Sequence, residues 1–192
     1  MKIHTPKTTL ALAAAIASGL LAGRAAAQSG AAGNGELVAR GKYLVTTSAC
    51  HDCHTPLMLG PNGPEPDFSR MLSGHPQSLE MPPPPEPVGP WTSAFSETNT
   101  AWAGPWGVSF TANLTPDPDT GLGRWTLRNF VDTIRSGRHM GRGREILPPM
   151  PIPMYRNFAD DDLAAIFAFL QSIPPVSNRV PEPRPPATEA SQ

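Results

Sequence analysis

Cys50-His51-Asp52-Cys53-His54 is the stretch on which the predicted fold depends. Two cysteines separated by two residues and followed directly by a histidine form the attachment motif of a c-type haem. Each thiol can form a thioether with one vinyl group of the porphyrin, and the short loop then carries His54 beneath the ring. The sequence contains no other cysteine. We therefore predict one covalently bound haem c, attached through Cys50 and Cys53, with His54 as an axial iron ligand.

Two other uses of a Cys-x-x-Cys pair agree less well with the sequence. A thioredoxin-like redox pair lies next to a βαβ pattern, and no such pattern is visible here. A structural zinc site needs four ligands, usually with a second paired spacing. The remaining histidines show no such pair; they are His4, His51, His75 and His139.

The first 27 residues have the features of a secretory signal peptide. Lys2 and Lys7 give a basic start, an apolar run covers residues 10–22, and three alanines at 25–27 form a small-residue cleavage site. The apolar run is shorter than the ~20 residues that a spanning helix needs. We therefore predict cleavage near Gln28, export to the periplasm of a bacterium with two membranes, and no membrane span in the mature chain.

The composition indicates a small core with long irregular connections. The chain contains 25 prolines and 17 glycines, which disfavour long helices and central strands. Without residues 1–27 the chain keeps 12 Lys and Arg against 16 Asp and Glu, because three basic residues lie in the signal segment. This mildly acidic balance gives no reason to expect nucleic-acid binding.

Apolar spacing and terminal signals predict three helices. Gly41 lies on the apolar face of the first helix, Gly137 ends the second, and Pro174 follows the third. Asp160 places negative charge at the start of the third helix, where the helix dipole favours it. The predicted helices cover about residues 36–47, 127–136 and 160–173.

The remaining segments complete the predicted domain organisation. A Pro/Gly-rich insertion at about 56–107 contains Trp91, Trp102 and Trp106 as apolar anchors. The predicted segments are a signal peptide (1–27), a flexible lead (28–35), one domain (36–176) that includes the insertion, and a Pro-rich, disordered tail (177–192).

Taken together, these residues resemble a class I-type monohaem cytochrome c, and in particular bacterial cytochrome c proteins and cytochrome subunits that serve periplasmic dehydrogenases. The resemblance implies an all-α fold of three to four core helices around one haem. It also implies that Gly41 on the first helix and Phe169 on the last allow these two helices to cross closely. The motifs that carry the resemblance, besides the haem motif, are Asn113-Leu114-Thr115-Pro116-Asp117, Thr120-Gly121-Leu122-Gly123, Pro149-Met150-Pro151 and residues 161–170.

The resemblance also suggests the second axial ligand of the iron. Cytochromes of this class take a methionine thioether from a loop shortly before the last helix, which leaves Met150 and Met154. The Pro-Met-Pro motif corresponds to the ligand position of the family, so Met150 is the predicted ligand and Met154 the alternative, while His139 is a weaker candidate. Trp125 is a further cofactor-binding candidate, because its indole N–H can donate to a haem propionate; burial in the core is the other interpretation.

The resemblance implies a periplasmic electron-transfer protein that is not itself an enzyme. Its implied redox partners are a dehydrogenase as donor and another cytochrome or a terminal oxidase as acceptor. Two alternatives remain open at this point. The chain can be a haem-binding subunit of a larger dehydrogenase complex, or a haem enzyme or sensor with a labile sixth ligand.

Overall fold

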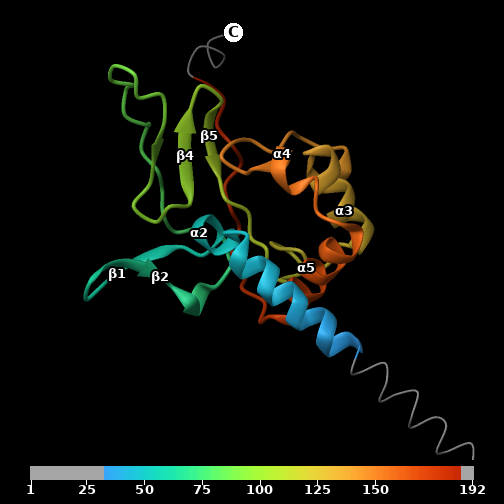
Figure 1. Cartoon of the computed structure of the whole chain (residues 1–192). Coiled ribbons are helices and arrows are strands. Elements are labelled where there is room, and N and C mark those ends of the chain that lie inside the picture. The colour runs from blue at the N-terminus through green and yellow to red at the C-terminus, as the bar shows by residue number, and fades with distance from the viewer. Residues whose placement is uncertain (1–32, 187–192) are drawn as a thin grey trace, which may run out of the picture. The chain divides into compact units, whose positions relative to one another are not determined.

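A computed structural model of the chain describes residues 33–186 (Figure 1). The predicted signal peptide (1–27), most of the predicted lead and the end of the chain (187–192) lie outside the described residues. The chain from Val38 onward forms one unit. None of the described helices is both long enough and apolar enough to cross a membrane.

The three predicted helices are present. The N-terminal helix covers residues 33–47 and so begins three residues earlier than expected. The side chain of Thr126 caps α3 (Leu127–Ser136) by accepting from the backbone N–H of Asn129, and Gly137 ends it with a φ of 69°. Helix α5 (Asp160–Ser172) has three aspartates in its first turn. Shorter helical segments are α2 (Cys50–His54), α4 (Ile152–Tyr155), η1 (Phe68–Arg70) and η2 (His139–Gly141).

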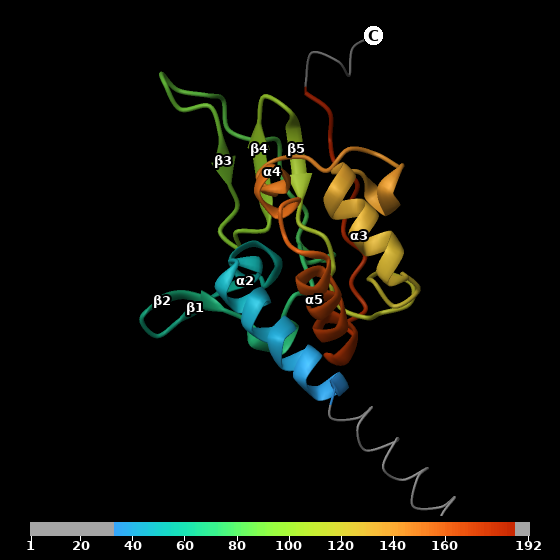
Figure 2. The ribbon, with the colours of Figure 1, turned by 45° about the vertical axis from the view of Figure 1, so that its right-hand side comes forward.

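The N-terminal helix and α5 cross closely at Gly41, as the resemblance implied (Figure 2). A Cβ atom placed on Gly41 would overlap the carbonyl oxygen of Ala165 and would lie 2.8 Å from the Cβ of Phe169. Leu44 and Val45, one turn further along, are buried in the main core cluster. The absence of a side chain at residue 41 therefore allows the two helix backbones to touch.

The predicted all-α fold class is wrong, because the insertion forms two antiparallel sheets. The described residues contain a hairpin of β1 (Leu57–Gly60) and β2 (Gly63–Pro66), and a three-stranded sheet in the order β3 (Ala94–Phe95), β4 (Ala101–Gly104), β5 (Gly107–Phe110). The fold is thus mixed α and β. High proline and glycine content excludes long central strands, but it is compatible with short hairpins whose turns use these residues.

The hairpin of β4 and β5 is more buried than that of β1 and β2, because every residue of β5 is buried. Its register pairs Ala101 with Phe110 and Gly104 with Gly107, and Gly107 has a φ of 91° that favours glycine. Ala101, Val108 and Phe110 form a second, smaller core cluster. Of the three tryptophans expected as anchors, Trp91 is instead 75% exposed.

The predicted disorder of residues 177–192 is contradicted for the described part, which reaches residue 186. Arg184 and Val108 exchange two backbone hydrogen bonds of 2.8 and 2.9 Å, so the segment lies beside β5 (Figure 1, red). The side chain of Asn178 is buried and donates to the carbonyl oxygens of Ser73 and His75. These partners lie about a hundred residues earlier in the chain. For this reason no local sequence pattern indicates that the segment is ordered.

Candidate functional site

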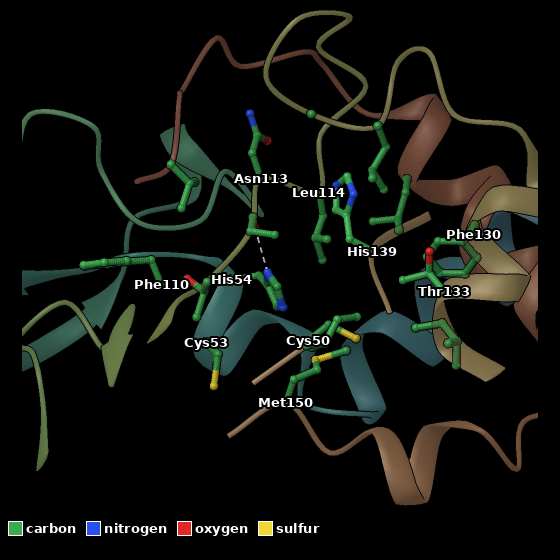
Figure 3. A pocket seen from close by; sticks show the side chains of 18 of the residues that line it. Cys50, Cys53, His54, Phe110, Asn113, Leu114, Phe130, Thr133, His139 and Met150 are labelled. Atoms are coloured by element: carbon green, nitrogen blue, oxygen red, sulfur yellow. Dashed lines mark hydrogen bonds between the residues drawn. The ribbon is translucent and has the colours of Figure 1, made fainter. Parts of the chain in front are cut away.

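The predicted cofactor residues line a single cavity of about 550 Å³ (Figure 3). This volume lies in the ~300–1,000 Å³ range of small-molecule and cofactor sites. The cavity is bordered by α2, by the chain that follows β5, by the loop before α4 and by the C-terminal segment. Its apolar wall is formed by side chains around α3 and α5, namely Leu114, Leu122, Phe130, Ile134, Leu163, Ile166 and Leu170.

His54 is held in a defined orientation at this cavity. Its side chain is buried, and its Nδ1 lies 2.8 Å from the carbonyl oxygen of Ala112, shown as a dashed line in Figure 3. A carbonyl oxygen can only accept, so Nδ1 carries the proton and donates, and Nε2 keeps a free lone pair. Burial lowers the pKa of His54, which favours the neutral imidazole. A histidine that donates its other N–H to a carbonyl is the usual arrangement of an iron or zinc ligand.

Cys50 and Cys53 are both free thiols on α2, three residues apart. Burial raises the pKa of Cys50 to about 11 and raises the pKa of Cys53 as well. Both groups are therefore protonated at neutral pH. The hydroxyl of Tyr155 donates to the carbonyl oxygen of Ser48, which ties α4 to the chain that leads into the two cysteines.

The structure separates the two methionine candidates. Met150 is half-buried, packs against the main core cluster and lines the cavity. Met154 is 71% exposed and is not among the residues that line the cavity. Figure 3 shows Met150 at the same pocket as His54 and Cys50. Burial and position thus favour Met150 over the alternative.

Trp125 and His139 also line the cavity. Their rings meet edge to face, with centroids 5.2 Å apart and an interplanar angle of 87°. Trp125 is half-buried and packs against the main core cluster. Its two interpretations, core packing and a place at the cofactor site, are therefore compatible with each other.

Several known proteins with similar sequences are named as cytochromes c or cytochrome c subunits. The chain is 29% identical to the cytochrome c subunit of the quinone-dependent alcohol dehydrogenase of Gluconobacter oxydans over 151 residues, which is 76% of this chain and 24% of that subunit. It is 27% identical to the cytochrome c subunit of the gluconate 2-dehydrogenase of Pantoea cypripedii over 145 residues, which is 75% of this chain and 25% of that subunit. It is 35% identical to a dihaem c-type cytochrome of Cereibacter sphaeroides over 77 residues, which is 40% of this chain and 25% of that cytochrome. The chain is a relative of the bacterial cytochromes c.

The sequence similarity covers only part of each of these relatives. No family model matches the chain, and the chain spans less than a third of the length of each of these relatives. Their description as cytochromes c implies haem c as the cofactor.

The cavity fits the haem that this cytochrome relationship implies. Two thiols on one short helix, an oriented imidazole nitrogen and a thioether sulfur are the donor set of a c-type haem. Apolar side chains of α3 and α5 can cover the porphyrin faces. Arg124, Arg144 and Arg179 also line the cavity and can balance the negative charge of the propionates.

Several residues of the candidate site were not found by sequence reasoning. Ala112 supplies the carbonyl that orients His54, Ser109 of β5 borders the cavity, and Arg179 and Glu182 reach it from the C-terminal segment. A backbone carbonyl carries no side-chain signal. Ser109 lies next to the insertion, where the sequence showed no clear pattern.

Proposed function

We propose that the chain is an exported, periplasmic monohaem cytochrome c that carries single electrons and is not itself an enzyme. The observation that carries this proposal is the convergence of Cys50, Cys53, His54 and Met150 on one largely apolar cavity. In this proposal Cys50 and Cys53 would attach the haem, and His54 and Met150 would bind its iron.

When bound, the haem supplies the one-electron couple of its iron. The protein residues hold, orient and shield it. The carbonyl oxygen of Ala112 accepts from Nδ1 and fixes the His54 ring, so that Nε2 keeps its lone pair for the iron. The Met150 thioether gives a soft, neutral ligand, which raises the reduction potential relative to harder ligands. The apolar side chains of α3 and α5 exclude water and limit reorganisation during electron transfer.

The proposed partners follow from the relatives, which are named as cytochrome subunits of dehydrogenases. We propose a periplasmic dehydrogenase as donor and a further cytochrome or a terminal oxidase as acceptor. Transient complexes of this kind use small interfaces.

A second candidate function is that of a bound subunit in a larger dehydrogenase complex. It is favoured by the names of the relatives and by large apolar side chains on the insertion, since Leu59 is 83%, Trp91 75% and Phe95 66% exposed. Size-exclusion chromatography of a native extract distinguishes the two. A free carrier elutes at the mass of the chain alone, whereas a subunit co-elutes with a dehydrogenase.

The visible spectrum separates an electron carrier from a haem enzyme or sensor. We expect six-coordinate, low-spin spectra in both the oxidised and the reduced protein, and no binding of carbon monoxide at neutral pH, because Met150 closes the sixth position. A high-spin spectrum, or a reduced form that binds carbon monoxide readily, would instead indicate an enzyme or a gas sensor.

A further inference from the structure

We propose that Ser109 is a positioning residue for Met150, so that β5 and its continuation to Ala112 hold both axial ligands of the iron. This inference rests on the proposed function, which assigns Met150 as a ligand. Ser109 lies two positions beyond the predicted end of the insertion, on β5, which pairs with β4 of the insertion. The proposal therefore links the insertion to the electron-transfer site.

Ser109 makes a short hydrogen bond to the loop that carries Met150. Its hydroxyl is 2.5 Å from the carbonyl oxygen of Pro148 and 3.4 Å from that of Trp102. A serine hydroxyl has one proton to donate, and the shorter contact is the better bond. Ser109 is buried, whereas the bond to Pro148 as a whole is part-buried.

The loop around Met150 has few backbone N–H groups that can form hydrogen bonds. Pro149 and Pro151 flank the methionine, and proline has no backbone N–H to donate. The backbone N–H of Ile152 bonds to the carbonyl oxygen of Met150 at 2.9 Å, which fixes the chain after the ligand. The bond from Ser109 fixes the chain two residues before it.

The strand that carries Ser109 is itself well anchored. Val108 exchanges two backbone hydrogen bonds with Arg184. Beyond β5, Thr111 donates through its N–H to the carbonyl of Thr100 at 2.9 Å and accepts at its own carbonyl from the N–H of His75 at 3.0 Å. The next residue is Ala112, whose carbonyl accepts from Nδ1 of His54.

Ser109 and Ala112 thus lie three residues apart on one anchored segment. One contacts the loop of the proposed thioether ligand, and the other contacts the imidazole ligand. Loss of the Ser109 hydroxyl should loosen the Met150 loop and leave His54 in place. The iron–thioether bond should then open more often, which favours any external ligand that competes for the sixth position.

The test is Ser109→Ala in the haem-loaded protein, with Thr111→Val as the matched control. Thr111 lines the same cavity, and its buried hydroxyl has no hydrogen-bond partner in the described part of the chain. Competition for the sixth position is measured by titrating the oxidised protein with imidazole. The signal is the decrease of the near-infrared thioether-to-iron band. We expect Ser109→Ala to bind imidazole about two- to tenfold more tightly, which is the range that one net hydrogen bond gives, and Thr111→Val to match the unsubstituted protein.

Ser109→Thr keeps the hydroxyl and should restore an imidazole affinity closer to that of the unsubstituted protein. Equal affinity in Ser109→Ala and the unsubstituted protein would overturn the proposal, as would an equal gain in Thr111→Val. Failure of the proposed function has a different signature: the unsubstituted protein would lack the near-infrared band, or Met150→Ala would retain it.

Discussion

Replacing Met150 with alanine is expected to abolish the near-infrared thioether-to-iron band and to lower the reduction potential. The methyl side chain of alanine cannot bind iron, so water or another ligand takes the sixth position. Axial ligands set haem potentials over a range of ~0.8 V, and we expect a decrease on the order of 100 mV. Absorption spectra of the oxidised protein and a potentiometric titration measure the two effects.

Met154→Ala is the control for this substitution. Met154 lies four residues further along and is 71% exposed, so its removal should leave the band and the potential unchanged. The ligand assignment is wrong if Met154→Ala removes the band while Met150→Ala leaves it intact.

Gly41→Val is expected to cause the largest loss of stability among single substitutions in the N-terminal helix. Any Cβ at residue 41 would overlap the carbonyl oxygen of Ala165, and a backbone atom cannot turn aside as a side chain can. The helices must separate, which disturbs the packing of Val45 and Phe169 in the main core. Overpacking of this kind costs roughly 1–3 kcal/mol, and we expect the upper end of that range.

Guanidinium unfolding of the haem-loaded protein measures this loss of stability. Lys42→Ala is the control, because Lys42 is the next residue in the same helix and is exposed; it should unfold at nearly the same denaturant concentration as the unsubstituted protein. An unchanged midpoint for Gly41→Val would show that the N-terminal helix and α5 do not touch at this position.

The parts of the structure that were predictable are those with a local cause. The capping Thr126, the terminal Gly137 and the aspartates before Leu163 mark helices through contacts within a few residues. The cysteines and His54 are fixed by their spacing alone. Met150, in contrast, was assigned mainly by resemblance, because the one local feature that distinguishes it from Met154 is a proline on each side.

The parts that escaped prediction depend on distant partners. Strands β4 and β5 pair with each other, and β5 also pairs with Arg184, while the strand sequences are too short to show alternation. Asn178 is buried because Ser73, His75 and the N–H of Gln77 surround its amide. A Pro-rich segment with one asparagine resembles a disordered tail until these contacts, about a hundred residues away, are known.

The most direct test of the proposal is the intact mass and colour of the mature protein, produced in the periplasm together with a c-type haem maturation system. We expect a mass equal to that of the polypeptide plus one haem, a strong Soret band, and no thiol that reacts with an alkylating reagent after unfolding. A colourless protein with the mass of the bare polypeptide and two reactive thiols, at Cys50 and Cys53, would contradict covalent haem attachment and everything that depends on it.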